Sequence, residues 1–166
     1  MTGAEAAPAN AAASEASASG AVVLRLGASR YAVAMADIAE VAPVPGLTRI
    51  PGAPTWLAGV ANWRGRMLPV LDLRPLLGAE VVTLPGSARL VVLSRDGVVA
   101  GVVAEAVPGV YDGDLTSAAP APPTLAAAAA ALVTGQVNDR TGPLAVLDAA
   151  AVLALRDQVD RRRHGA

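Results

Sequence analysis

The sequence contains no cysteine, no lysine and no phenylalanine, and its single histidine, His164, stands two residues from the C-terminus. The absence of cysteine excludes disulfide scaffolds, thiolate metal sites and cysteine nucleophiles, and it is typical of a reducing compartment. One terminal histidine gives no basis for Ser/His/Asp chemistry or for a histidine-based metal site. The sequence therefore offers no candidate for a catalytic centre, cofactor site or metal site built on cysteine or histidine.

The sequence also lacks an excess of charge of one sign and any long apolar run. All 13 basic residues are arginine, and 14 acidic residues bring the formal net charge to −1, so no broad positive field exists to attract nucleic acid. The N-terminus has no basic segment followed by an apolar core, and no stretch approaches the ~18 unbroken apolar residues that suggest a membrane span. We expect a cytoplasmic protein that binds no nucleic acid and does not insert into a membrane.

Composition divides the chain into three parts. Residues 1–20 are rich in alanine and serine and hold little apolar area, so they predict a disordered tail. Residues 21–156 carry the strand-like runs and predict the folded domain. Residues 157–166 form the charged end of a last helix and a short tail.

The chain contains an internal repeat. Residues 59–77, GVANWRGRMLPVLDLRPLL, recur without a gap at residues 135–153 as GQVNDRTGPLAVLDAAAVL. A repeat of this kind indicates two copies of one supersecondary unit. Many short apolar runs separated by glycine and proline predict about ten strands in two small barrels or sheets. The expected fold is therefore mainly β, with short helices and a C-terminal helix.

Each repeat has a tight turn followed by an aspartate. Asn62-Trp63-Arg64-Gly65 predicts a hairpin turn, because asparagine and glycine tolerate positive φ. Gly59, inside a strand, indicates a bulge or the close approach of another backbone. Asp72 and Asp148 are a conceivable carboxylate pair, but each stands where a strand meets a helix, so we interpret both as helix caps.

Trp63 and Arg64 together suggest a binding site for another protein, because tryptophan and arginine dominate interface energies. Taken separately, an arginine at a turn is commonly a solvated charge, and a tryptophan in a chain without phenylalanine can equally fill the core. Two alternatives to protein binding stay open. A small-ligand or enzymatic module needs a polar pocket, for which the sequence offers no triad, metal cluster or phosphate loop. A single-strand nucleic-acid binder can stack bases on tryptophan, but the net charge predicts no retention in filter binding.

The run LTRIPGAPTWLAGVANWRGRMLPVLDLRPLLG, residues 47–78, resembles the signature of the CheW-like domain family. Its parts are a proline-containing approach, a G-V-x-N-x-R-G hairpin, a strand ending P-V-x-D-L and a short helix. The hairpin with Tyr31, the segment Ile38 to Val41 and GVVAEAV at residues 101–107 extend the resemblance over residues 22–155. It implies two five-stranded SH3-like β-barrel subdomains related by the internal repeat.

The resemblance also implies a function and a site. A non-enzymatic adaptor would couple the cytoplasmic tips of chemoreceptors to the regulatory domain of a CheA-type histidine kinase, and it would meet other CheW-like domains in an array. A non-flagellar pathway, acting on pili or in surface sensing, is the alternative within the family. Trp63 replaces the aliphatic residue usual at its position, and whether Ile38 and Glu40 face receptor or kinase stays open. The implied partner-binding residues are Ile38, Glu40, Gly59, Asn62, Trp63, Arg64 and Gly65.

Overall fold

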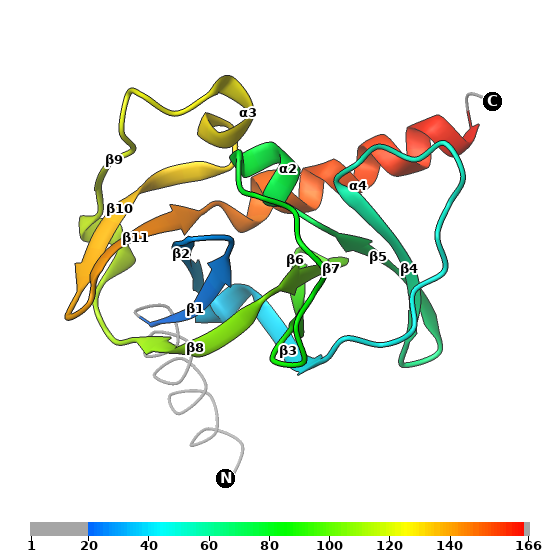
Figure 1. The fold of residues 1–166 in the computed structure, drawn as a ribbon, viewed down its shortest axis with the longest axis horizontal. Helices are drawn as coiled ribbons and strands as arrows, with labels where there is room; N and C mark the ends of the chain where they lie inside the picture. The colour runs from blue at the N-terminus through cyan, green and yellow to red at the C-terminus, as the bar shows by residue number, and fades with distance from the viewer. Residues whose placement is uncertain (1–19, 165–166) are drawn as a thin grey trace, which may run out of the picture.

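A computed structural model describes residues 20–164 of the chain, so all of the predicted tail except Gly20 lies outside the described residues. Eleven strands fall within this range, and its last element is a helix, as predicted. Figure 1 shows their arrangement. The mainly β fold is confirmed. The elements in chain order are β1 (Ala21–Leu26), β2 (Ser29–Ala34), the 3-10 turn η1 (Met35–Asp37), β3 (Ile38–Pro43), β4 (Leu57–Trp63), β5 (Arg66–Leu71), α2 (Arg74–Leu77), β6 (Arg89–Arg95), β7 (Val98–Ala104), β8 (Ala106–Tyr111), the 3-10 turn η2 (Leu115–Ser117), β9 (Ala119–Pro120), α3 (Ala127–Ala130), β10 (Val133–Asp139), β11 (Gly142–Leu147) and α4 (Ala149–His164).

The strands of residues 20–164 form two sheets, and each sheet takes strands from both halves of the chain. One has the order β8-β1-β2-β11-β10-β9 and the other the order β3-β6-β7-β5-β4. The hairpin β1–β2 of the first half therefore pairs with β11 of the second repeat. The hairpin β6–β7 of the second half pairs with β5 of the first repeat, and both contacts are parallel. The five strands expected per unit are present in one sheet, and the two-residue strand β9 adds a sixth to the other.

Alternate residues of these hairpins serve different cores. Val22, Leu24 and Leu26 of β1 lie in a central core between the two sheets, whereas Ala21 and Val23 lie in the core of their own sheet. In β6 the same division separates Val91 and Leu93 from Leu90 and Val92. These strands are buried on both faces, which explains why they read as continuous apolar runs rather than as alternating ones.

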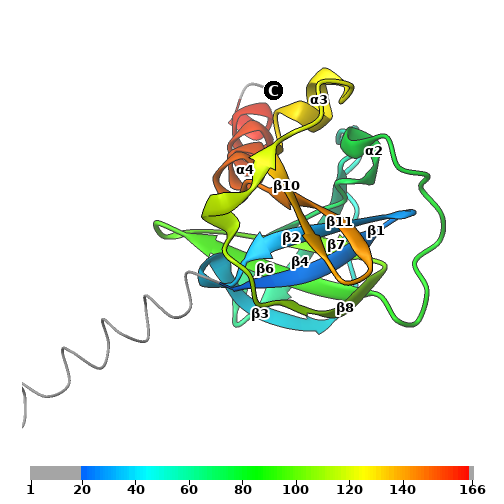
Figure 2. The same cartoon turned by 90° about the vertical axis from the view of Figure 1, so that its left-hand side faces the viewer.

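The helices are short except for the last. Helices α2, α3 and α4 lie at one end of the molecule (Figure 2). Asp72 and Asp148 both accept a hydrogen bond from the amide two residues further on, at 3.1 and 3.0 Å, so their predicted capping role is confirmed. Gly78 ends α2 in the left-handed conformation with a φ of 70°. The alanines of residues 127–130 form the single turn α3.

Gly59 is required by the close approach of another backbone, as its place in a strand predicted. It lies at a register shift in the β4–β5 ladder with a φ of 152°. A Cβ built on it would stand 2.6 Å from the carbonyl oxygen of Thr48. Gly135, its counterpart in the second repeat, lies at the equivalent shift, and its Cβ would stand 2.5 Å from the Ala119 oxygen. In both repeats, the missing side chain of glycine thus lets another segment pass close to the strand.

We expect Gly59→Ala to lower the free energy of unfolding by about 1–3 kcal/mol, because the new methyl group meets backbone and the φ is strained. Urea unfolding followed by circular dichroism measures the change. Gly46→Ala is the matched control, since nothing lies within 4 Å of a Cβ at that position. Equal midpoints for Gly59→Ala and the wild type would contradict the account.

Candidate functional site

The turn between β4 and β5 is a two-residue hairpin loop with positive φ at both central positions, 52° at Arg64 and 75° at Gly65. This is the geometry of a type I′ turn, which matches the twist of the flanking strands. The Asn62 side chain accepts a hydrogen bond from the Gly65 amide at 3.0 Å. Arginine is unusual at positive φ, so the turn holds Arg64 in a fixed backbone conformation at the tip of the hairpin.

Glu40, Trp63 and Arg64 form a cluster that joins β3 to this turn. The indole N–H of Trp63 donates to Glu40 Oε2 at 2.5 Å, and Arg64 Nη2 lies 3.7 Å from Glu40 Oε1. The Arg64 guanidinium carbon lies 4.7 Å from the centroid of the Trp63 ring, within the range of a cation–π interaction. The Arg64 side chain is nevertheless 65% exposed, so its charge stays open to a partner.

The remaining predicted residues have other positions. Asn62 and Gly65 shape the turn. Ile38 is half-buried at the start of β3 and packs against the central core, and Gly59 is buried beside Thr48. The structure thus brings Glu40, the turn and its tryptophan together, whereas Ile38 and Gly59 support the neighbouring backbone.

The equivalent turn of the second repeat is anchored differently. Asp139 occupies the position of Trp63 and accepts two hydrogen bonds from Arg30, at 2.6 and 2.8 Å. Its carboxylate also accepts from the backbone N–H and the hydroxyl of Thr141. The hydrogen bonds from Arg30 and then Thr141 hold the pKa of Asp139 well below its ordinary value. Arg140, the counterpart of Arg64, is exposed.

The Asp139 pair predicts acid sensitivity. Because the pKa of Asp139 is lower in the folded than in the unfolded protein, its stabilising contribution is complete above the unfolded value near 4 and is lost as the pH falls toward the folded value. We expect Asp139→Asn to flatten the dependence of Tm on pH between about 5 and 2, measured by circular dichroism. Asp157→Asn, which removes an exposed carboxylate on α4, should keep the wild-type slope. A steep slope retained in Asp139→Asn would count against the assignment.

A groove of about 750 Å³ runs beside β4, between the connection 44–56 and the connection 79–88. Val81 and Val82 are exposed apolar residues on its wall, and Arg49 is an exposed cation on its rim. Asp72 and Arg74 also contribute to its lining. No motif in the sequence pointed to this groove. The two adjacent valines in an otherwise loop-like segment were its only signal.

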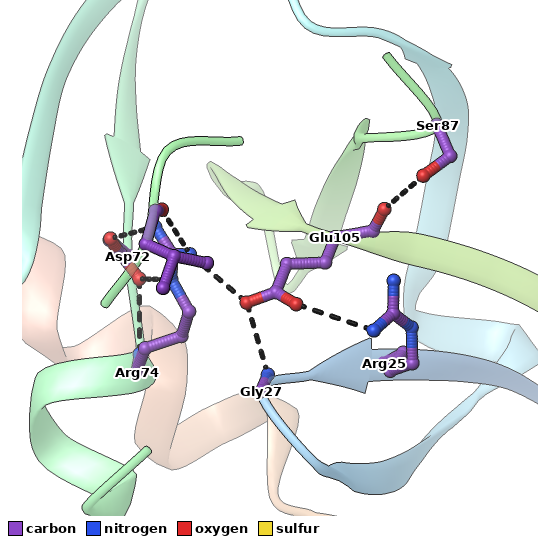
Figure 3. A network of polar contacts seen from close by, with 7 residues as sticks. Arg25, Gly27, Asp72, Arg74, Ser87 and Glu105 are labelled. Atoms are coloured by element: carbon purple, nitrogen blue, oxygen red, sulfur yellow. Dashed lines mark hydrogen bonds and ion pairs between the residues drawn. The ribbon is translucent and has the colours of Figure 1, made fainter. Parts of the chain in front are cut away.

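Arg74 is the centre of a buried ion network (Figure 3). Its guanidinium donates to both oxygens of Asp72, at 3.0 and 2.9 Å, and to Glu105 at 3.0 Å. Glu105 also accepts from the amide of Gly27 and lies 3.5 Å from Arg25. These residues come from both sheets, so the network connects β5 and α2 to the β1–β2 hairpin. Its partners explain why three charged residues can be buried.

Two features are absent from the described residues, a cluster of metal-binding side chains and a helix that could span a membrane. Among residues 20–162, whose side chains the structure describes, no three His, Cys, Asp or Glu side chains gather as a metal ion would require. No helix within residues 20–164 is long and apolar enough to cross a bilayer.

The family model of the CheW-like domain matches residues 20–157, which include both sheets, the Arg64 turn and the ion network. The chain belongs to the CheW-like domain family. Protein PilI of Pseudomonas aeruginosa is 39% identical over 85 residues, 51% of this chain and 48% of PilI. Protein FrzA of Myxococcus xanthus is 38% identical over 85 residues, 51% of this chain and 53% of FrzA. The chain therefore matches about half the length of these two CheW-like relatives.

Proteins named CheW are similar over a longer region at lower identity. The chemotaxis protein CheW of Klebsiella aerogenes is 27% identical over 114 residues, 69% of each chain. The crystal structure of the scaffolding protein TtCheW from Thermoanaerobacter tengcongensis superposes with a TM-score of 0.70 at 27% identity, covering 78% of this chain and 88% of that one. The CheW-like fold is thus shared across most of the described residues.

Sequence reasoning placed the hairpin and its turn in this CheW-like domain, but it missed the contacts made across sequence distance. Trp63 reaches Glu40 and Arg74 reaches Glu105. Each pair joins segments that lie far apart in the sequence. The pattern of apolar residues predicts each segment but not its contacts with another. The capping aspartate Asp72 was identified, whereas the arginine that neutralises it was not.

Proposed function

We propose that this protein is a non-enzymatic adaptor that couples the cytoplasmic tips of chemoreceptors to the regulatory domain of a CheA-type histidine kinase. The observation that carries the proposal is the Arg64 turn of a CheW-like domain, which holds an exposed guanidinium beside an indole on a rigid hairpin. Arginine and tryptophan supply most of the energy in many protein interfaces. No cofactor is required for this role, and the place of action is the cytoplasm, at receptor arrays.

The partner-binding surface centres on Glu40, Trp63 and Arg64 in this proposal. Asn62 and Gly65 contribute by fixing the turn, and Ile38 and Gly59 contribute by holding β3 and β4 in place. Receptor and kinase bind different faces, so that the adaptor raises their effective concentration near each other. Contacts with further CheW-like domains would extend such a complex into an array.

A second candidate is an adaptor in a chemosensory pathway other than the flagellar one. Two relatives at 39% and 38% identity carry the names PilI and FrzA rather than CheW. The biochemical role would be the same, with another receptor and another kinase as partners. We expect adaptors of different pathways to share the partner-binding surface and to differ in how closely it matches a given partner.

Reconstitution tests the proposal. Receptor cytoplasmic fragments are attached to vesicles, and the sedimentation of the histidine kinase is measured with and without this protein. We expect the kinase to sediment with the vesicles only when the protein is present. Kinase retention that is independent of the protein would refute an adaptor role. Receptor and kinase pairs from each chemosensory gene cluster of the source genome, tested in parallel, separate the two candidates.

A further inference from the structure

Trp63 makes a side-chain connection between two edge strands that lack a backbone ladder. In the order β3-β6-β7-β5-β4, the strands β3 and β4 stand at opposite edges. The 2.5 Å hydrogen bond from the Trp63 indole to Glu40 nevertheless links these two strands. The sheet must therefore curl until its edges meet. The segment after β3 closes part of the gap through the backbone bridge of Thr48 and Val60, and at the hairpin end the Trp63–Glu40 bond joins the edges.

The packing of the indole makes this connection rigid. Trp63 is half-buried against the core inside the same sheet, which contains Ala61 and Leu68. The ring is thus held on its apolar side while its N–H reaches a carboxylate on the other strand. Hydrogen bonds to charged acceptors are stronger than neutral ones. Trp63 therefore combines a packed ring with a strong polar contact at one position.

The second repeat fixes its hairpin through a different contact. At the position equivalent to Trp63, Asp139 binds Arg30 of β2 through two hydrogen bonds. The residue types differ completely, yet both hairpins are fixed to a strand outside the hairpin by the side chain that precedes the turn arginine. In the second repeat, β2 already pairs with β11, so these bonds reinforce an existing contact, whereas the Trp63–Glu40 bond joins two edge strands.

We infer that Trp63 is a positioning residue: its indole N–H holds β3 against the β4–β5 hairpin, and its ring face holds Arg64 in the exposed orientation. Glu40, Trp63 and Arg64 then form one preorganised unit, which lowers the ordering cost when a partner binds. The closure of the sheet is a property of the free protein. Only the step from closure to partner affinity rests on the proposed function.

Three variants separate the parts of this unit. Trp63→Phe keeps a ring under Arg64 but removes the N–H donor. Glu40→Gln keeps an acceptor for the indole but removes the charge that faces Arg64. Glu40→Ala removes both. Because phenylalanine and glutamine are conservative at these half-buried positions, thermal melts should show all three proteins folded, and Glu40→Gln alone decides the indole contact if Trp63→Phe does not fold.

Amide hydrogen exchange and NMR of the free protein test the inference. We expect the amides of β3 to exchange about tenfold faster in Trp63→Phe and in Glu40→Ala, as loss of one charged hydrogen bond predicts. Glu40→Gln keeps a weaker, neutral acceptor, so its β3 exchange should lie between the wild type and Glu40→Ala, and its Trp63 indole N–H signal, assigned by comparison with Trp56→Phe, should stay protected from water. Strands β10 and β11 of the other sheet serve as the internal control.

Two results would overturn the inference. Unchanged β3 exchange in Trp63→Phe would show that the indole does not hold the strand. Exchange in Glu40→Gln as fast as in Glu40→Ala would assign the connection to the charge of Glu40 and not to the indole. These measurements need no partner, so they decide the inference even if the reconstitution fails. If partners do bind, Trp63→Phe should weaken binding about tenfold through loss of preorganisation, and unaltered affinity would refute that last step.

Discussion

Replacing Arg74 with methionine should lower the free energy of unfolding by about 3–5 kcal/mol, because it leaves the buried Asp72 carboxylate without its cation and Glu105 with only the exposed Arg25, 3.5 Å away. The Arg74 and Glu105 side chains are 4% and 6% exposed, and Asp72 is similarly buried. Urea unfolding, followed by circular dichroism and fluorescence, measures the change. A loss that large should leave the protein only marginally folded at neutral pH.

Removing the carboxylates together with the cation tests the cause. The triple variant Arg74→Met, Asp72→Asn, Glu105→Gln should be clearly more stable than Arg74→Met alone, since no unpaired charge is then buried. Arg25→Ala is the matched control, because Arg25 lies 3.5 Å from the same Glu105 but is 43% exposed, and exposed pairs contribute at most about 1 kcal/mol. If Arg74→Met and Arg25→Ala cost the same, burial of the network does not determine its energy.

The fold was predictable where local chemistry decides it. The repeat at residues 59–77 and 135–153, the Gly65 turn and the Asp148 cap follow from spacing and turn propensity, and all are present in the structure. The exchange of the first hairpins between the two sheets was not predicted. Residues 21–34 and 89–104 are both apolar hairpins with the same period, so nothing in either one specifies the half with which it pairs.

The candidate site divides in the same way. The turn around Arg64 could be recognised from Asn62, whose side chain accepts from the Gly65 amide, and from Gly65, whose positive φ favours glycine. Its link to Glu40 depends on the curl of the five-stranded sheet, which brings β3 to β4 across 23 residues of sequence. Likewise, Asp72 could be identified as a cap, but the ion network around it depends on where the fold places Glu105 relative to Arg74. Long-range side-chain pairs depend on the assembled fold, and the sequence pattern does not contain them.

We expect Arg64→Glu to abolish co-sedimentation with receptor and kinase while the melting curve stays nearly unchanged. Arg64 is an exposed turn residue whose contact with Glu40 is a long ion pair of 3.7 Å, so its loss affects folding by less than about 1 kcal/mol. At an interface, truncation of an anchoring arginine costs ~2 kcal/mol or more, which is roughly 30-fold in affinity, and charge reversal adds repulsion. Arg64→Ala, which avoids placing a second carboxylate beside Glu40, should show the loss without the repulsion.

Arg140→Glu provides the comparison that makes this test specific. Arg140 occupies the same place in the second repeat, is exposed and follows an anchored residue, but its turn contains Asp139 in place of an indole. Net charge changes equally in the two variants, so a general electrostatic effect on binding would weaken both. Loss of binding in Arg64→Glu alone would assign recognition to the first repeat. Full binding by Arg64→Glu, or equal losses in both variants, would show that Arg64 is not a specific determinant of partner binding.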